Sequence, residues 1–318
     1  MATIDLKEVD KVEILTLQDN YIDLVSQDGN EVVQRALPLK GLEFRNSISA
    51  EHGFSALVTI TSGEQVRTIL FDFGFSEKGA FDNAQALNVD LSSVEMLALS
   101  HGHADHTGGF KAMVNAIGKK GMTMLAHSAA FRKDRVIKIS EEFKIKMPKL
   151  EKADVEAANV ELVETDGPYP MLDGALYFLG GIPRMTAFEK GAASFVYQDN
   201  GEEKWDAIDD DTSIVANVKG KGLVILSGCA HAGIVNTVNY AKQLTGTDDL
   251  YAVMGGFHLT GGEFAATIDP TAKALKELNP RYIVPTHCTG RNASMKIQND
   301  MPDQFLLNMS GTRMVFAA

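Results

Sequence analysis

Three histidines and one aspartate gather in the segment SHGHADHTGG, residues 100–109. His101 and His103 are two positions apart, and Asp105 and His106 follow closely. In an extended segment, residues two apart point to the same side, so the first two histidines can reach one cation. If the chain then turns, Asp105 and His106 can reach a second cation about 3.5–4 Å away. Imidazole and carboxylate groups bind zinc, iron and manganese, so this spacing predicts a two-metal site.

Three further histidines follow apolar runs elsewhere in the chain. His231 lies in LVILSGCAHAG, His258 in YAVMGGFHLTGG and His287 in YIVPTHCTG. A two-metal site needs ligands from several segments, and strand ends that each deliver a histidine near glycine can supply them. We therefore expect His231 and His287 to bind metal. For His258, a metal ligand, a proton-transfer group and a substrate contact all remain open.

The elements that would position these residues alternate between apolar runs and amphipathic segments. The expected strands are 11–17, 56–62, 66–74, 94–100, 121–127, 175–181, the hairpin 213–229, 250–256 and 281–290. The expected helices are 80–90, 108–118, 234–246 and 270–278. Strands mixed with helices in both halves predict an α/β (α+β) fold. We expect a four-layer αββα sandwich of two mixed β-sheets with helices outside.

No linker, low-complexity tract or internal repeat divides the chain, so a single domain over 1–318 is expected. The segment 128–156 is rich in Lys and Glu and has helical spacing. It is expected to form a helical insertion or a lid near the site.

The composition excludes several classes of function. The chain has 30 Lys and Arg against 42 Asp and Glu, a net charge of −12, which disfavours binding to a nucleic-acid backbone. No signal peptide or long apolar span is visible, so neither export nor membrane insertion is expected. Only two cysteines are present, Cys229 and Cys288, and this fits a reducing cytoplasm. The sequence does not indicate an oligomeric state.

The motifs SHGHADHTGG and ILFDFG together resemble the metallo-β-lactamase fold superfamily. The segments AEHGFSALV, GGIPR, SGCAHAGIVN, GGFHL and HCTG are similar to one branch of it. That branch contains dihydropterin–ribofuranosylaminobenzene phosphate synthases and related metal-dependent hydrolases. The resemblance covers most of the chain, because HCTG matches the family's last metal histidine.

The resemblance implies roles for several residues. Asp72 in LFDFG matches a buried acid that orients the metal loop. Most members place a bridging aspartate after a glycine near ILSG, where this chain has Cys229, and a histidine on an earlier strand. We infer that His231 replaces that histidine. For Cys229, a soft metal ligand and a small buried apolar residue are both open.

We expect six of these residues to bind two cations, three residues to each. His101, His103 and His231 would hold one cation, and Asp105, His106 and His287 would hold the other. Two divalent ions are expected, with zinc first and iron or manganese as alternatives.

These ligands favour a metal-dependent hydrolase that uses metal-activated hydroxide on a small ester, lactone or phosphoester. The alternatives are a transferase of the dihydropterin–ribofuranosylaminobenzene phosphate synthase type and a non-catalytic metal-binding sensor. Asp105 and His258 are the expected catalytic residues. The expected partner is a small molecule, for which an anion would suit the site.

Residues outside the ligand set are expected to contact substrate. Arg184 in GGIPRM can form a forked contact with a carboxylate or phosphate. The resemblance places Glu51 and His52 near the pocket, and His258 belongs to the same group. The acidic segment 206–213, DAIDDDTS, lacks the ligand order of a calcium loop and is expected to be solvated.

Overall fold

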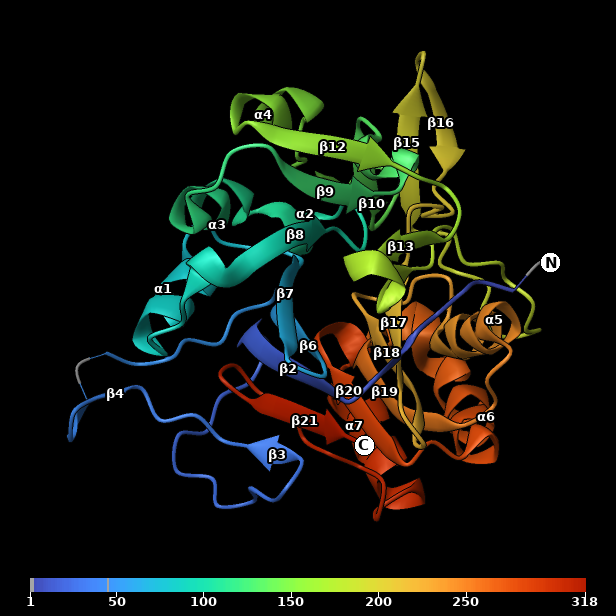
Figure 1. The fold of residues 1–318 in the computed structure, drawn as a ribbon. Helices are drawn as coiled ribbons and strands as arrows, with labels where there is room; N and C mark the ends of the chain where they lie inside the picture. The colour runs from blue at the N-terminus through green and yellow to red at the C-terminus, as the bar shows by residue number, and fades with distance from the viewer. Residues whose placement is uncertain (1–2, 45) are drawn as a thin grey trace.

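The computed structural model describes residues 3–44 and 46–318 and places most strands in two mixed sheets (Figure 1). The eight-stranded sheet runs in the order β12 (Val160–Glu164), β9 (Met122–Ala126), β8 (Val94–Ala98), β7 (Gln65–Phe71), β6 (Ser55–Ser62), β2 (Lys11–Gln18), β21 (Arg313–Ala317) and β3 (Val33–Gln34). The seven-stranded sheet contains β13 (Tyr169–Met171), β14 (Leu176–Phe178), β17 (Ser213–Val218), β18 (Gly222–Ser227), β19 (Leu250–Gly256) and β20 (Tyr282–Thr286), with β1 (Glu8–Val9) beside β17.

Two smaller sheets lie outside this pair. One has the order β11 (Lys144–Lys146), β10 (Arg135–Lys138), β15 (Phe195–Asp199) and β16 (Glu202–Trp205), and the other pairs β4 (Leu39–Lys40) with β5 (Glu43–Phe44). The α-helices are α1 (Gly79–Ala86), α2 (Ala104–Thr107), α3 (Phe110–Ile117), α4 (Lys152–Ala157), α5 (Ile234–Thr245), α6 (Ile268–Leu278) and α7 (Arg291–Asp300). Short 3₁₀ helices span Leu91–Ser93, Ser128–Phe131, Leu172–Gly174, Gly262–Thr267 and His287–Thr289.

The buried apolar residues fall into three large clusters that separate the layers. One lies between the two large sheets, one between the seven-stranded sheet and α5 to α7, and one between the eight-stranded sheet and α1, α3 and α4. Along β18, Val224 and Leu226 enter the central cluster, whereas Leu223 and Ile225 face the helices. Both faces of this strand are thus buried, which explains its unbroken apolar run. Helices α1 and α3 lie on one side of the sheets and α5 and α6 on the other (Figure 1), in agreement with the expected αββα layering.

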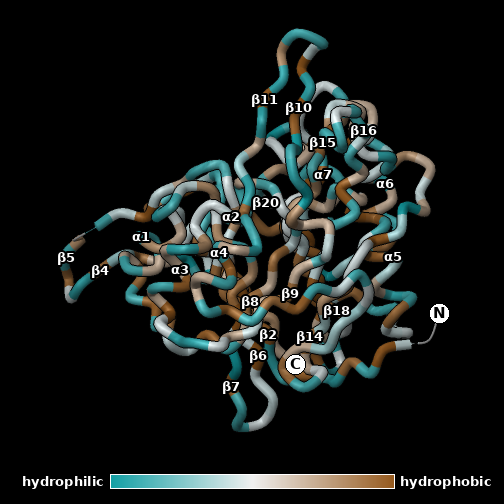
Figure 2. Tube along the Cα trace, turned by 90° about the horizontal axis from the view of Figure 1, so that it is seen from above, coloured by the Kyte–Doolittle hydropathy of each residue, from teal (hydrophilic) through white to brown (hydrophobic). Residues whose placement is uncertain are grey.

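The segment 128–156 differs from its expected form. It contains the strands β10 and β11, and only its last residues enter the short helix α4. The expected helical insertion is therefore wrong, since Arg135–Lys138 pair with β15 instead. Figure 2 shows the β10–β11 hairpin extending from the body of the molecule, while β8 and β9 form part of its apolar interior. Its charged residues suit a projecting hairpin as well as they suit a solvated helix.

The parallel strands end at a shared edge of the two sheets. In the eight-stranded sheet β7 and β8 are parallel, and in the other sheet β18, β19 and β20 are parallel. The carboxyl ends of parallel strands meet at one edge, where ligand sites of α/β proteins form. Asp72 and the His101 loop follow the first pair, and the histidine-bearing turns at 231, 258 and 287 follow the second set.

Candidate metal centre

His101, His103 and His231 form an imidazole trio at this edge. Their ring centroids are 4.5 to 4.8 Å apart, and the residues are 0%, 5% and 6% exposed. The Nε2 atom of each ring is buried and has no hydrogen-bond partner among the described residues. A buried polar atom without a partner is costly, so three of them on rings this close fit a cation bound by the trio.

The trio is held in its neutral form. Burial lowers the pKa of His103 to about 3. Burial also lowers the pKa of His101 and of His231 well below 6.5, and the neighbouring histidines add to this effect. Neutral imidazole is the form that binds metal, so these rings can bind without first losing a proton.

A buried serine sets the tautomer of His101. The hydroxyl group of Ser100 donates to Asp72 Oδ2 at 2.7 Å. The Oγ atom of Ser100 also lies 3.0 Å from Nδ1 of His101. Because its proton is used, Ser100 Oγ accepts from Nδ1–H, which leaves Nε2 of His101 as a lone pair. Asp72 thus acts on the trio through Ser100, as an acid that orients the metal loop would.

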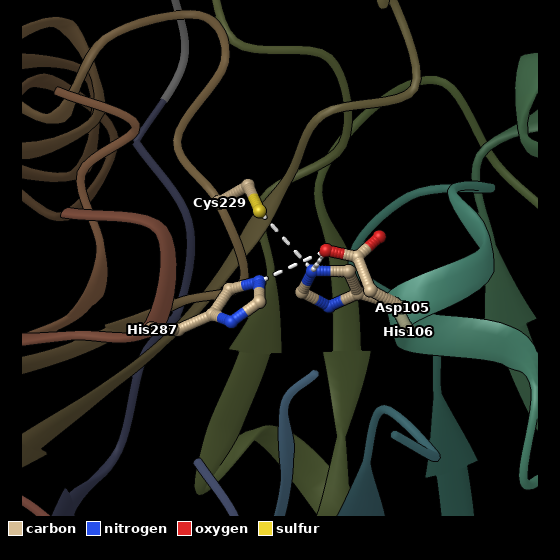
Figure 3. Close-up of side chains that lie close together, drawn as sticks. All are labelled: Asp105, His106, Cys229 and His287. Atoms are coloured by element: carbon tan, nitrogen blue, oxygen red, sulfur yellow. Dashed lines mark hydrogen bonds and ion pairs between the residues drawn. The ribbon is translucent and has the colours of Figure 1, made fainter. Parts of the chain in front are cut away.

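A second donor group, the mixed quartet, consists of Asp105, His106, Cys229 and His287 (Figure 3). Nε2 of His106 lies 3.1 Å from Cys229 Sγ, and Nε2 of His287 lies 3.1 Å from Asp105 Oδ2. These atoms come from three separate segments, and each is a metal donor of zinc or iron sites. The structure therefore brings together all six predicted ligands, in the trio and the quartet.

The carboxylate of Asp72 also fixes a member of the quartet. His106 Nδ1–H donates to Asp72 Oδ2 at 2.6 Å, so Nε2 of this ring faces the other donors. Burial acts to lower the pKa of His106, but the charges of Asp72 and Asp105 outweigh it and raise this pKa to about 9. Burial likewise opposes ionisation of Asp105, yet the surrounding histidines hold its pKa well below 3.8.

His287 is oriented by two residues that the sequence analysis missed. Asn20 Oδ1 lies 3.1 Å from Nδ1 of His287, and Asp19 Oδ1 accepts from its main-chain N–H at 2.9 Å. With the Nδ1 proton directed to Asn20, neutral His287 presents a lone pair to the Asp105 carboxylate. Two acceptors face each other there unless a proton or a cation lies between them. The sequence did carry one signal: both residues follow β2 directly, at a strand end.

Two glycines allow the loops to approach this closely. A Cβ atom on Gly102 would lie 1.8 Å from the carbonyl oxygen of Ala130. One on Gly228 would lie 2.0 Å from Ser100 Oγ. Only glycine fits at these positions, so the turn before Cys229 packs directly on the loop that carries the trio's first histidine.

A family model for the metallo-β-lactamase superfamily matches residues 53–240. The chain belongs to the metallo-β-lactamase superfamily. The match ends before His258 and His287, but the curated relatives extend further. A 7,8-dihydropterin-6-methyl-4-(β-D-ribofuranosyl)-aminobenzene-5'-phosphate synthase of Methanocaldococcus jannaschii is 29% identical over 304 residues, 95% of each chain.

Two other comparisons support the same family and fold. An uncharacterized protein of Methanocaldococcus jannaschii is 33% identical over 254 residues, which are 78% of this chain and 88% of that protein. A solved structure described as a metal-dependent hydrolase of the β-lactamase superfamily has a TM-score of 0.70 at 24% identity. It covers 96% of this chain and 100% of its own, which supports the metallo-β-lactamase fold over the full length.

Within this metallo-β-lactamase site, Cys229 is central. Its Sγ atom lies within 4.8 Å of donor atoms of the quartet, of His101 and His231, and of His258 and Cys288. The sulfur atoms of the two cysteines are 3.1 Å apart, and both residues are buried. Burial raises the pKa of the Cys229 thiol. The sequence left its role open, and the structure places it where it can contact both donor groups.

His258 lies beside the trio in a small pocket. Its ring centroid is 4.1 Å from that of His231 and 4.8 Å from that of Phe264. Its backbone φ is +42°, a left-handed conformation that a histidine rarely adopts. Nδ1 of this ring is buried and has no hydrogen-bond partner among the described residues. Lys190 also lines the pocket, and one ring nitrogen of His258 lies within 4.8 Å of the sulfur atoms of Cys229 and Cys288.

His52 and Glu51 lie on the other side of the site, by the quartet. His52 Nε2 is 3.5 Å from Asp105 Oδ2, and its side chain is 61% exposed. Glu51 Oε1 accepts a hydrogen bond from the main-chain N–H of Ser76 at 2.9 Å. The placement of His52 agrees with a position at the mouth of the site. Glu51 stabilises a neighbouring loop, and its contact with substrate stays a prediction.

Arg184 contacts the main chain of the site. Its NH2 group donates to the carbonyl oxygens of Ala207 and His231, the latter at 3.1 Å. This guanidinium thus fixes the turn that carries His231. Its expected contact with a substrate carboxylate or phosphate stays a prediction.

The acidic segment 206–213 is not the solvated loop that was expected. Asp206, Asp210 and Asp211 are 2%, 0% and 1% exposed. Burial raises the pKa of Asp211 to about 7, whereas Arg135 outweighs burial at Asp210 and lowers the pKa of that carboxyl. The prediction is wrong because the buried Arg135 pairs with Asp206 and Asp210 and compensates for their charges.

Proposed function

We propose that this protein is a metal-dependent hydrolase acting on an ester, lactone or phosphoester bond of a small anionic molecule. The observation that carries the proposal is the imidazole trio, whose three buried Nε2 atoms lie close together without partners. The mixed quartet beside it supplies a second donor set. Both sets suit zinc first, with iron or manganese as alternatives.

The chain's own residues would divide the work. Divalent cations bound at such donors lower the pKa of water and polarise a substrate oxygen. The trio and the quartet would hold them, while Asp72 keeps His106 and Ser100 in orientation. Asp105 would accept a hydrogen bond from the attacking water and so orient it. Cys229 would contribute its sulfur as a thiolate ligand.

Lys190 in the pocket beside the trio supports the choice of an anionic substrate. Glu189 lines the same pocket, but its carboxylate accepts from the main-chain N–H groups of Val235 and Asn236. Lys190, Phe188 and Phe264 line the pocket together with His231 and His258. A lysine at the rim attracts an anion, and the phenylalanine rings can pack against an apolar or aromatic part of the molecule. His258 would donate a proton or a hydrogen bond to the leaving group from its position next to His231.

A transferase is the second candidate, and the synthase relative favours it, since the similarity covers 95% of both chains. In that reading the trio and the quartet would hold the same divalent cations, which would supply a binding site for the phosphate or diphosphate of a pterin substrate and assist its departure. The two functions differ in the group that takes the place of the leaving group. Water does so in hydrolysis, whereas an aromatic ring or amine does so in transfer.

Elemental analysis of protein purified without added metal tests the proposal first. We expect about two divalent ions per chain, followed by turnover of a phosphoester or lactone in a screen. Release of diphosphate from a pterin diphosphate only when an aminobenzene acceptor is present would favour transfer over hydrolysis. A full metal content without turnover of any of these would favour a sensor. An intact fold that takes up no cation would overturn the proposal.

A further inference from the structure

The acidic loop, residues 206–212, joins β16 to β17 and passes beside the metal centre. Three of its four aspartates are buried, while the side chain of Asp209 is 55% exposed. Buried carboxylates are costly unless they are paired and hydrogen-bonded. The partners of these side chains therefore indicate what the loop does.

Asp210 bonds to the loop that carries the trio's first two histidines. Its Oδ2 atom accepts from the main-chain N–H of Gly102 at 2.7 Å, and this glycine lies between His101 and His103. Two residues further on, the N–H of Thr212 donates to the carbonyl oxygen of Ser100 at 3.0 Å. The acidic loop thus holds the histidine loop at two points, immediately beside both ligands.

Arg135 holds the acidic loop in turn. This residue comes from β10 in the smaller sheet, and its side chain is 4% exposed. Its guanidinium contacts both oxygens of Asp210, with NH1 at 3.0 Å from Oδ2, and its Nε lies 2.8 Å from Asp206 Oδ2. A forked arginine contact fixes the direction of a carboxylate as well as its charge. Asp210 therefore has little freedom to turn away from Gly102.

The neighbouring aspartate does the same for the trio's third histidine. Asp211 Oδ2 accepts from the main-chain N–H of Ala232 at 2.9 Å, directly after His231. Two adjacent residues of the acidic loop thus bond the two separate loops from which the trio is assembled. No other segment of the described chain is seen to bond both loops through carboxylates.

We propose that Asp210, fixed by Arg135, is a positioning residue that sets the His101–His103 loop so that the trio can bind a cation. The inference rests on the proposed metal-dependent function. It assigns Asp210 and Arg135 a role outside the candidate metal ligands, because neither belongs to the trio or to the quartet. It also makes the trio, and not the quartet, the group that depends on the acidic loop.

The test compares Asp210→Asn with Asp209→Asn, a matched change at the exposed aspartate of the same loop. Hydrogen–deuterium exchange of the peptide covering 100–104 is measured in chelator-treated protein, and Co²⁺ affinities are measured by competition with a chelator. For Asp210→Asn we expect exchange at least about tenfold faster. One of the two cations should bind about 10–100-fold more weakly, as for other partners of metal ligands. The second cation should change by less than about twofold, and Asp209→Asn should change nothing.

Arg135→Lys is the second variant in case Asp210→Asn does not fold. It keeps the positive charge but removes the fork, and we expect the same selective loss to a smaller degree. Equal weakening of both cations, or exchange no faster than in Asp209→Asn, would overturn the proposal. If the unmodified protein binds no cation, the proposed function fails, whereas the exchange of the 100–104 peptide still decides whether Asp210 holds the loop.

Discussion

The imidazole trio and the mixed quartet lie side by side, yet their polar atoms are satisfied differently. The three Nε2 atoms of the trio have no hydrogen-bond partner among the described residues. In the quartet, by contrast, His287 contacts Asp105 and His106 contacts Cys229, each pair at 3.1 Å. The quartet can therefore compensate for a lost cation by sharing protons, whereas the trio cannot. We infer that the trio is the group that depends more strongly on its cation.

The pKa values of the histidines also distinguish the trio from the quartet. Burial lowers the pKa of every trio histidine, so these rings stay neutral. In the quartet, burial is outweighed at His106 by Asp72 and Asp105, and its pKa rises to about 9. One group is built from neutral ligands, and the other contains opposite charges that attract each other. The two neighbouring donor groups thus differ in charge, and this difference should appear in metal affinity and in pH dependence.

Removing one ligand from each group should give the largest effect. His231→Ala leaves two imidazoles in the trio, and we expect the metal content to fall from about two ions to about one per chain. His287→Ala should also release one ion, but the trio should keep its own. Elemental analysis with chelator titration checks both variants. If His287→Ala lost both ions while His231→Ala kept one, the inference that the trio depends more strongly on its cation than the quartet does would be wrong.

The second effect concerns Cys229, whose Sγ atom lies near donor atoms of both the trio and the quartet. In Cys229→Ser we expect the loss of the near-ultraviolet sulfur-to-cobalt absorption of Co²⁺-loaded protein, because only a thiolate ligand produces it. Both cations should bind on the order of tenfold more weakly. Cys288→Ser is the matched control, which should keep the band. An unchanged spectrum in Cys229→Ser would show that the sulfur is a buried apolar group and not a ligand.

The third effect is a pH dependence of the stability of chelator-treated protein. Stability should fall toward acidic pH because of the trio and toward alkaline pH because of His106. The trio's lowered pKa values contribute stability that is present above pH 6.5 and is lost as the pH falls. The raised pKa of His106 contributes stability that is present below pH 6.5 and is lost as the pH rises through about 9. A shift from 6.5 to about 9 corresponds to roughly 3 kcal/mol. Thermal unfolding between pH 5 and 10 measures both slopes.

Asp72→Asn separates the two slopes. The amide removes the charge that raises the pKa of His106 but keeps the shape of the side chain. We expect the alkaline slope to flatten while the acid slope persists. A variant that loses both slopes together would indicate that the trio and the quartet do not titrate independently.

The candidate ligands could be named from the sequence because their signals are local. Spacing in the 100–109 segment and histidines after strand ends were sufficient to name six residues that the structure brings together, and their binding of metal stays a prediction. The structure adds Asn20 and Asp19, whose contacts with His287 span 267 and 268 residues of sequence. No local pattern reveals such pairs. The strand-end position was the only available signal.

The two wrong predictions have a common cause. The acidic segment 206–213 and the segment 128–156 both have the composition of solvated chain. Their charges compensate each other, since Arg135 pairs with Asp206 and Asp210, 71 and 75 residues away. Composition measures how many charges a segment has, but not whether a distant segment neutralises them. The burial of the acidic segment, and the strand pairing of the segment 128–156, therefore became visible only in the folded chain.

The smallest expected effect concerns the mouth of the quartet. His52 is mostly exposed, and its Nε2 atom lies 3.5 Å from Asp105. Its ring also packs on His287, with 4.8 Å between the ring centroids, and its Nδ1 atom lies 3.1 Å from Asn20 Nδ2. His52 is not a member of the quartet, so His52→Ala should leave the metal content unchanged. Burial lowers the pKa of His52, so its contact with Asp105 is that of a neutral imidazole. We expect kcat/KM to fall by about 2–10-fold, since a hydrogen bond of this kind is worth about 1 kcal/mol. His258→Ala, at the trio's pocket, should cost more, because that ring is partly buried and has an unpartnered nitrogen. Steady-state kinetics on one substrate compare the two variants. If kcat/KM fell equally in both variants, the pocket beside the trio could not be distinguished from the solvent-exposed mouth of the quartet as the place where substrate binds.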